Sequence, residues 1–235
     1  MRKISYILLI IGLLFSSCRK DELIFVSDSS AVSIPVQLEN IQGFYLLNEG
    51  NMGMNRATLD WFDYETGLYT RDIFAERNPA IPRELGDVGN DLKIYGTKAY
   101  ATINASNFIE VFDVATGKHI KQIHVPNCRY LAFADGKVYV SSFSGKIETN
   151  PNAEIGFVAE IDTIALQVRR KVEVGYQPEE IVIHGSKLYV ANSGGYREPQ
   201  YDTTVSVVDL QTFTEIKKIE VAPNLHRMQV DHKGD

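Results

Sequence analysis

The feature that most constrains the fold of this chain is a segment that recurs four times and carries an aspartate just before a turn. Aligned on that aspartate, the copies read VVDLQTFTEIKKIEV, EIDTIALQVRRKVEV, VFDVATGKHIKQIHV and WFDYETGLYTRDIF, anchored at Asp209, Asp162, Asp113 and Asp63. Successive anchors lie 47, 49 and 50 residues apart. A second marker, a turn followed by an apolar residue and a tyrosine, precedes the anchor in three copies, at Tyr100, Tyr139 and Tyr189. Two markers in the same order indicate an internal repeat.

One complete copy of the repeat occupies residues 175–221. Four short runs rich in Val, Ile and Tyr, separated by polar or glycine-containing turns, predict strands at 180–183, 188–191, 205–209 and 216–221. No run has helical periodicity over the length that a helix needs. A four-stranded antiparallel unit with a period in the forties predicts an all-β fold, the β-propeller, in which each blade packs against its neighbours. A β-sandwich also has many short strands, but it predicts no such repeat.

The repeats predict about four blades that do not close into a ring. The first copy begins at Gly43 with the equivalent of a second strand, since Tyr45 aligns with Tyr189 and Asn48 with Asn192. The last copy stops in a turn at Asp235. We therefore expect residues 43–235 to be an incomplete propeller, a fragment without its C-terminal blades, and to leave strand edges and an apolar blade face uncovered.

The start of the chain has the layout of a secretory signal. Arg2 and Lys3 precede the apolar run YILLIIGLLF, which is too short for a confident membrane span. The sequence LFSSC resembles a bacterial lipoprotein box, which implies a signal peptide at residues 1–17 and lipidation of Cys18. The alternative is an ordinary signal peptide with an incidental cysteine. The following residues RKDE resemble an export signal for the outer leaflet of Gram-negative cells, and residues 18–42 are expected to form a lipid anchor and tether.

Composition fits a domain that is held at a surface. Without Arg2 and Lys3, 22 basic side chains face 30 acidic ones, so the mature net charge is −8. A negative domain argues against nucleic acid as a partner and leaves the lipid anchor as the only expected contact with a membrane. The second cysteine, Cys128, has no partner for a disulfide and is expected to be a small packing residue.

Two sequence patterns resemble a known family. The YVAN at residues 189–192 and the D-x-x-T-G turns at residues 63–67 and 113–117 are similar to those of YncE-like, or YVTN-repeat, β-propellers. Together with the lipoprotein start, the chain resembles surface propellers that sit over TonB-dependent transporters, including BtuG-type proteins that capture cobalamin. This resemblance implies seven blades, a location at the cell surface of the outer membrane, a TonB-dependent receptor as partner and a corrinoid as one candidate ligand. No ligand-contacting motif of the family can be matched residue by residue.

The repeat also places candidate ligand-binding residues at one mouth of the channel. The loops that lead into each first strand lie there, and aligning the repeats puts four pairs of residues at equivalent positions: Asn90 and Asp91, Arg129 and Tyr130, Glu179 and Glu180, and His226 and Arg227. Such a mixed set suits a polar small molecule or a protein loop. The alternative is that these residues cap strands or join neighbouring blades.

Two long loops after second strands, residues 141–154 and 192–202, belong to the same mouth and are rich in Gly, Asn, Pro and Tyr. Loops of this kind on a rigid scaffold carry recognition or are solvated. Tyr196 and Arg197 combine a planar ring with a cation, which favours flat or amide-rich ligands.

Sequence patterns that indicate catalysis are weak. No histidine pair has the spacing of metal ligands, so neither a metal site nor a cofactor is expected. Glu179 and Glu180 are adjacent on a strand and point to opposite faces, which argues against a two-carboxylate mechanism. We expect a protein that is not an enzyme. A quinoprotein-like oxidoreductase, a lactonase and a protein-interaction scaffold remain the alternatives.

The lipid anchor yields the first testable prediction. Replacing Cys18 by Ser should abolish labelling of the protein with radioactive palmitate in growing cells, because the thiol is the acceptor for lipid. A matched Cys128→Ser variant should be labelled like the parent protein. Palmitate labelling that persists in Cys18→Ser would disprove the anchor.

Overall fold

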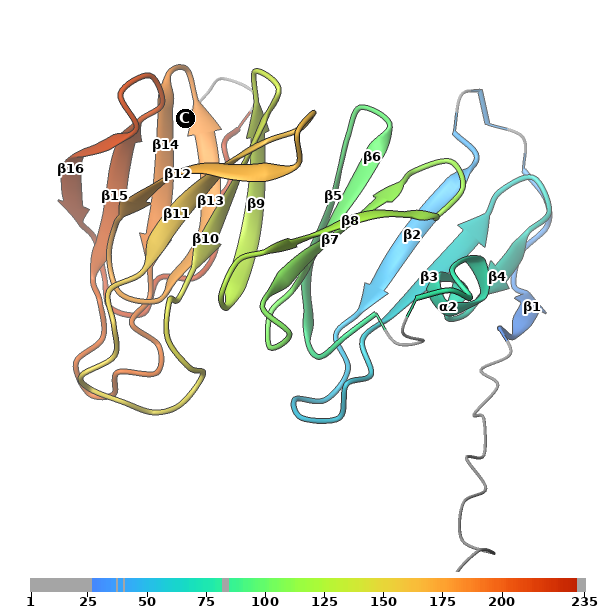
Figure 1. The fold of residues 1–235 in the computed structure, drawn as a ribbon, viewed down its shortest axis with the longest axis horizontal. Coiled ribbons are helices and arrows are strands. Elements are labelled where there is room, and N and C mark those ends of the chain that lie inside the picture. The colour runs from blue at the N-terminus through green and yellow to red at the C-terminus, as the bar shows by residue number, and fades with distance from the viewer. Residues whose placement is uncertain (1–26, 37, 40, 82–84, 232–235) are drawn as a thin grey trace, which may run out of the picture.

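The computed structural model describes residues 27–231 apart from residues 37, 40 and 82–84 (Figure 1). Within these residues all the strands belong to four antiparallel four-stranded sheets, which follow one another in chain order as an open arc. The predicted all-β fold of propeller blades is confirmed, and the open arrangement agrees with about four blades. The expected signal peptide and Cys18 lie outside the described residues.

The second, third and fourth blades each consist of four strands that pair in chain order, as the repeat predicts. The second blade contains β5 (Gly89–Tyr95), β6 (Lys98–Ile103), β7 (Phe108–Asp113) and β8 (His119–His124). The third contains β9 (Cys128–Ala134), β10 (Lys137–Ser142), β11 (Phe157–Asp162) and β12 (Gln167–Glu173). The fourth contains β13 (Pro178–His184), β14 (Lys187–Asn192), β15 (Thr204–Asp209) and β16 (Thr214–Glu220). The predicted strands of the complete copy are all present, with boundaries that differ by up to two residues.

The first blade differs in its strand order. Its strands β2 (Gly43–Asn48), β3 (Thr58–Asp63) and β4 (Leu68–Thr70) correspond to the second, third and fourth strands of the other blades. The side chain of Asn48 donates hydrogen bonds to the side chains of Thr58 and Asp60, as that of Asn192 does to the equivalent Thr204 and Ser206. These matching contacts support the alignment of the two copies.

The outer edge of the first blade is covered by a strand that the sequence did not predict. Residues of β1 (Ser29–Ala31), within the segment expected to be a tether, pair with β4. A short helix, α2 (Ile73–Arg77), follows β4 and buries Ile73 and Phe74 against the blade. The next residue, Asn78, accepts a hydrogen bond from the backbone N–H of His119 and so links the first blade to the second.

The repeated aspartates have a structural role. The side-chain oxygen of Asp113 accepts hydrogen bonds from the backbone N–H groups of Ala115 and Thr116, and Asp162 and Asp209 hold their turns in the same way. Asp63 accepts one such bond, from Thr66. An Asx turn of this kind satisfies backbone donors as the chain reverses. The turn therefore explains why the residue recurs at the end of each third strand.

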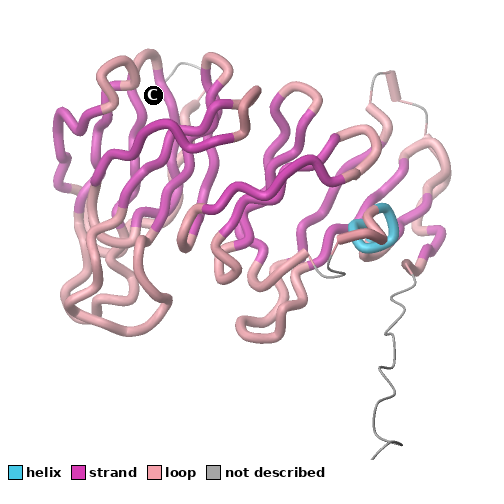
Figure 2. Tube along the Cα trace, in the orientation of Figure 1, coloured by secondary structure: helices cyan, strands magenta, loops and turns pink. Residues whose placement is uncertain are grey.

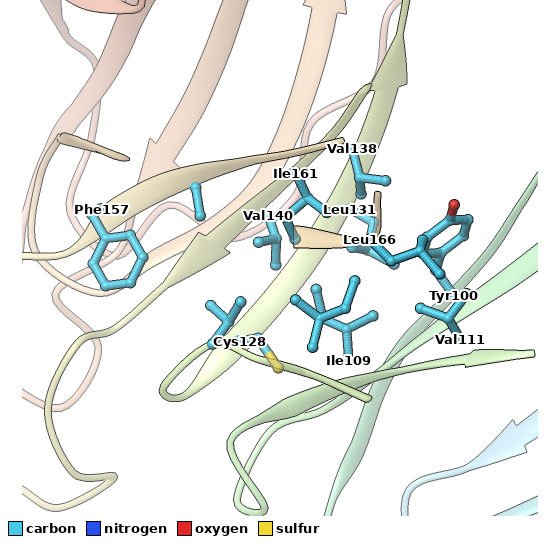
Figure 3. Packing of buried hydrophobic residues seen from close by; sticks show 13 residues of the cluster. Tyr100, Ile109, Val111, Cys128, Leu131, Val138, Val140, Phe157, Ile161 and Leu166 are labelled. Atoms are coloured by element: carbon cyan, nitrogen blue, oxygen red, sulfur yellow. The ribbon is translucent and has the colours of Figure 1, made fainter. Parts of the chain in front are cut away.

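Apolar side chains are buried between neighbouring blades. One cluster joins the first and second blades, one the second and third, and one the third and fourth. Figure 3 shows the middle cluster, where Tyr100 and Ile109 of the second blade meet Leu131 and Val140 of the third. Because successive side chains of a strand point to opposite faces, Tyr139 of β10 belongs to the next cluster. Strand β10 thus contributes to two interfaces.

Two buried hydroxyl groups add a repeated hydrogen-bond relay between blades. Thr102 and Ser141 lie two residues after Tyr100 and Tyr139. The hydroxyl of Thr102 accepts a bond from the N–H of Asp91 in its own blade (2.9 Å) and donates to the carbonyl of Arg129 in the next (2.7 Å). Ser141 connects the N–H of Tyr130 to the carbonyl of Glu179 at 3.1 and 2.7 Å. The relay fixes the first strand of one blade against the first strand of the next, β5 against β9 and β9 against β13.

This relay generates a stability prediction. Thr102→Val keeps the shape of the side chain but removes the hydroxyl partner of the Asp91 N–H and one of the two hydrogen bonds to the Arg129 carbonyl, so the free energy of unfolding should fall by about 1–3 kcal/mol. Thr102→Ser, which keeps the hydroxyl, should lose only about 0.8 kcal/mol for its methyl group. Urea denaturation measures both values. A Thr102→Val loss of less than about 0.5 kcal/mol, the range of ordinary surface changes, would contradict the relay.

Candidate functional site

The candidate site lies at the end of the molecule where the long loops gather, at the bottom of Figure 2. In the second, third and fourth blades, the loop after the second strand is joined by a backbone hydrogen bond to the residue just before the first strand. The N–H groups of Asn104, Phe143 and Ser193 donate to the carbonyls of Val88, Asn127 and Gln177, in that order. The three acceptor residues all have positive φ angles, of 62°, 42° and 47°. This shared conformation holds the mouth of each blade in the same shape.

At the centre of the site is an ion pair between the third and fourth blades. The Nε and Nη2 atoms of Arg129 on β9 donate to Oε2 of Glu179 on β13 at 3.0 and 2.9 Å. Only 15% of the Arg129 side chain and 6% of the Glu179 side chain are exposed. Burial raises the pKa of Glu179, and the charge of Arg129 opposes that rise. The pair is therefore a buried link between blades as well as a feature of the mouth.

Aromatic rings surround this arginine. Its guanidinium carbon lies 4.8 Å from the ring centre of Phe143 and 5.7 Å from that of Tyr130. Arg227 approaches the same Tyr130 ring at 4.8 Å, and the His226 ring meets it edge-on at 6.3 Å. His226 also places Nδ1 3.6 Å from Glu179. Cations and rings thus alternate, an arrangement that is stabilised by cation–π attraction.

The two long loops add further aromatic and cationic side chains to this set. The ring of Tyr196 meets that of Phe143 at 6.3 Å, and the Tyr196 carbonyl accepts a hydrogen bond from the N–H of Asn150 in the neighbouring blade. Arg197 lies 3.5 Å from the ring centre of Tyr176 and donates to the carbonyl of Pro151. The two loops therefore pack as one unit. We name the continuous set Arg227, Tyr130, Arg129, Phe143 and Tyr196 the mouth row.

Three of the predicted residues make contacts between blades. Asn90 donates from its side-chain amide to the carbonyl of Arg129, and Asp91 accepts from the N–H of Leu131, both at 2.9 Å. Glu180 accepts from the N–H of Met228 at 3.0 Å. These bonds match the stated alternative that some of the pairs join blades. The structure brings together the other seven predicted residues: Arg129, Tyr130, Glu179, Tyr196, Arg197, His226 and Arg227.

Phe143 and Tyr176 are the members of the site that sequence reasoning did not single out. Phe143 contacts Arg129 and Tyr176 contacts Arg197, which are both predicted site residues. Their signal in the sequence is position, because Phe143 directly follows β10 and Tyr176 comes two residues before β13. Both positions lie at the same mouth of the propeller.

The exposed groups of the site are cationic and aromatic. The side chains of Arg227 and His226 are 67% and 54% exposed, and Tyr196 is 39% exposed as a residue. A cavity of about 780 Å³ adjoins the row and is lined by Lys93, by residues 180–183 of β13 and by residues 227–230. Among the described residues, no three His, Cys, Asp or Glu side chains are grouped so that they could hold a metal ion. The arrangement is suited to binding planar or anionic groups.

Comparison with known proteins supports the fold. No protein-family model and no curated protein matches the chain. Hydrazine synthase of Kuenenia stuttgartiensis is similar with a TM-score of 0.59 at 14% identity, over 75% of this chain and 47% of that one. BamB of Moraxella catarrhalis is similar with a TM-score of 0.50 at 15% identity, over 74% of this chain and 46% of that one. The WD40 β-propeller domain of Doa1 has a TM-score of 0.48 at 16% identity, over 70% of this chain and 47% of that one.

At these identities the likeness concerns the fold alone. The chain spans about half the length of each of these solved structures. The four successive four-stranded sheets and their burial against one another show that the chain has a β-propeller fold.

The buried ion pair predicts an unusual pattern of stability. Arg129→Met leaves the Glu179 carboxylate buried without its counter-ion and should lower the free energy of unfolding by about 3–5 kcal/mol. Adding Glu179→Met should recover most of that loss, because two apolar side chains of similar size then replace the pair. Denaturant titration of the two single variants and the double variant measures the coupling. A double variant that loses the sum of the two single losses would contradict the predicted pairing.

Proposed function

We propose that this protein is a lipid-anchored β-propeller that captures a ligand at the outer surface of the cell and passes it to a TonB-dependent outer-membrane transporter. The mouth row is the observation that carries the proposal. It presents two exposed side chains, Arg227 and Tyr196, on loops that are held by a rigid sheet framework, which is how binding proteins present recognition residues. The anchor rests on the LFSSC sequence at Cys18, outside the described residues. In the described part of the chain, no helix has the length and apolarity to span a membrane.

The chemistry of the mouth row favours a broad, flat ligand with polar edges. Tyr196 offers an exposed ring, which packs against the buried ring of Phe143, while Arg227 offers donors for carbonyl or phosphate oxygens. A corrinoid combines a nearly planar macrocycle with amide side chains, so it meets both requirements. The adjoining cavity of about 780 Å³ lies within the range of roughly 300–1,000 Å³ typical of small-molecule sites. We therefore name a corrinoid as the first ligand to test.

The test is equilibrium dialysis of cyanocobalamin against the full-length protein in detergent. We expect saturable uptake, and we expect Tyr196→Ala and Arg227→Ala each to weaken it by roughly tenfold, the effect of one lost anchor residue. Both side chains are exposed, so their removal should leave the cooperative melt unchanged. Lys217→Ala, on the exposed outer strand β16, is the matched control and should bind like the parent protein.

Two outcomes would contradict the proposal in different ways. No uptake by protein that melts cooperatively would exclude corrinoids as the ligand. Uptake that is unchanged in both Tyr196→Ala and Arg227→Ala would place the binding site elsewhere on the molecule. Uptake that falls equally in the Lys217→Ala control would indicate that surface charge alone controls retention.

A further inference from the structure

The first blade has a strand edge that is open to a further strand. In the second, third and fourth blades, the second strand pairs with the first strand on one side and with the third strand on the other. Within the described residues, β2 is the second strand of the first blade and pairs with β3 alone. The other edge of β2 therefore presents backbone N–H and C=O groups to which another strand can be added.

A segment with the pattern of a strand follows the fourth blade. In residues 226–230, the half-buried Met228 and Val230 alternate with the exposed Arg227 and Gln229. Such alternation is typical of a strand with one covered face. In the part of the chain that the structure describes, this segment belongs to no sheet. It is therefore a strand-like sequence that lacks a second strand as its partner.

Hydrogen bonds place this segment where the first strand of a further blade belongs. The N–H of Met228 donates to the carboxylate of Glu180 on β13. The equivalent bond joins the N–H of Leu131 to the carboxylate of Asp91, and its donor lies on β9, the first strand of the following blade. Segment 226–230 is thus positioned relative to the fourth blade as β9 is relative to the second.

The outer face of the first blade is apolar and uncovered. Phe44 and Leu46 of β2 are 43% and 44% exposed. The equivalent residues of β14, Leu188 and Val190, are 0% exposed because they pack against the third blade. The first blade therefore lacks the neighbour that covers this face in the fourth.

The outer face of the fourth blade lacks a neighbour in the same way. Tyr189 on this face is only partly buried. Its equivalents Tyr100 and Tyr139 are 0% and 2% exposed because the following blade covers each of them. A first blade packed on this face would continue the series of interfaces that already joins the four blades. Figure 1 shows the first and fourth blades at opposite ends of the arc, so the two faces do not meet within one copy.

We propose that two copies of this 235-residue chain join head to tail into a closed ring of eight blades, four from each copy. Segment 226–230 of each copy adds to the free edge of β2 in the other, and the first blade of each packs on the fourth blade of the other. Closed propellers have four to eight blades, and head-to-tail contacts form a ring when their rotation closes. The pairing does not depend on the ligand of the mouth row.

The alignment of the repeats gives the register of the added strand. Met228 lies opposite Leu46, as Ile181 lies opposite Val190 in the fourth blade. Directly opposite residues of antiparallel strands have Cα atoms about 4.5–5.5 Å apart, which is within the range that a disulfide can bridge. A pair of cysteines at these two positions therefore reports the proposed contact.

Disulfide trapping between two variants tests the pairing. Full-length Leu46→Cys and Met228→Cys proteins are mixed and oxidised, and we expect a covalent dimer on a non-reducing gel. A mixture of Leu46→Cys and Gln229→Cys is the matched control and should give little dimer, because successive side chains of a strand point to opposite faces. The native Cys128 is buried and should not contribute.

Light scattering of the full-length protein in detergent tests the assembly, with the mass of the detergent subtracted. We expect the protein mass of two chains. Leu46→Lys should raise the dissociation constant of the pair at least tenfold, because its ammonium group would be buried against the fourth blade of the other copy. Ile164→Lys, at a 91% exposed residue between β11 and β12, is the matched control and should assemble like the parent protein.

Several results would overturn the proposal. A protein mass of one chain would exclude the pair, and a mass that grows beyond two chains would indicate open filaments. Equal trapping of Met228→Cys and Gln229→Cys would contradict the register, and an unchanged dissociation constant in Leu46→Lys would place the contact elsewhere. A double variant with both Leu46→Cys and Met228→Cys that forms its disulfide within one chain would show that the arc closes on itself.

Discussion

Contact between the faces of successive blades is the interaction on which the rest of this structure depends. A four-stranded sheet is one layer thick, so it cannot bury both of its faces by itself. Tyr100 and Tyr139 are almost completely buried only because each fits against the next sheet. Fully burying a large apolar side chain contributes roughly 1.5–3 kcal/mol, so the three interblade clusters dominate the stability of the arc. Strand pairing alone would leave four separate and marginal sheets.

These contacts between blades also determine the shape of the mouth. The hydroxyl relays of Thr102 and Ser141 fix one innermost strand against the next, and the Arg129–Glu179 pair joins the third and fourth blades at the point where the loops begin. Recognition groups such as Arg227 and Tyr196 can then remain exposed because buried neighbours determine their positions. The function proposed for the mouth therefore depends on the same framework that stabilises the fold.

Much of the architecture could be predicted from the sequence, because the constraints behind it are local and repeated. The aspartate turns and the tyrosine markers gave the order of the strands, and the alignment of Asn48 with Asn192 is supported by matching hydrogen bonds. The strand at Ser29–Ala31 escaped prediction because its pairing with β4 depends on a contact distant in sequence. The site was predicted in part. Position alone could not show whether Asp91 faces a ligand or a backbone N–H of the next blade.

Cys128 gives the interface between the second and third blades a chemical reporter. Its side chain is fully buried in the cluster that joins them, and burial raises the pKa of the thiol to about 12. Alkylating reagents attack the thiolate and need access to it, so the closed interface is almost inert toward them. The rate at which such a reagent modifies this cysteine therefore measures how often the two blades separate. Modification of Cys128 thus reports how often the arc opens at the junction between its second and third blades.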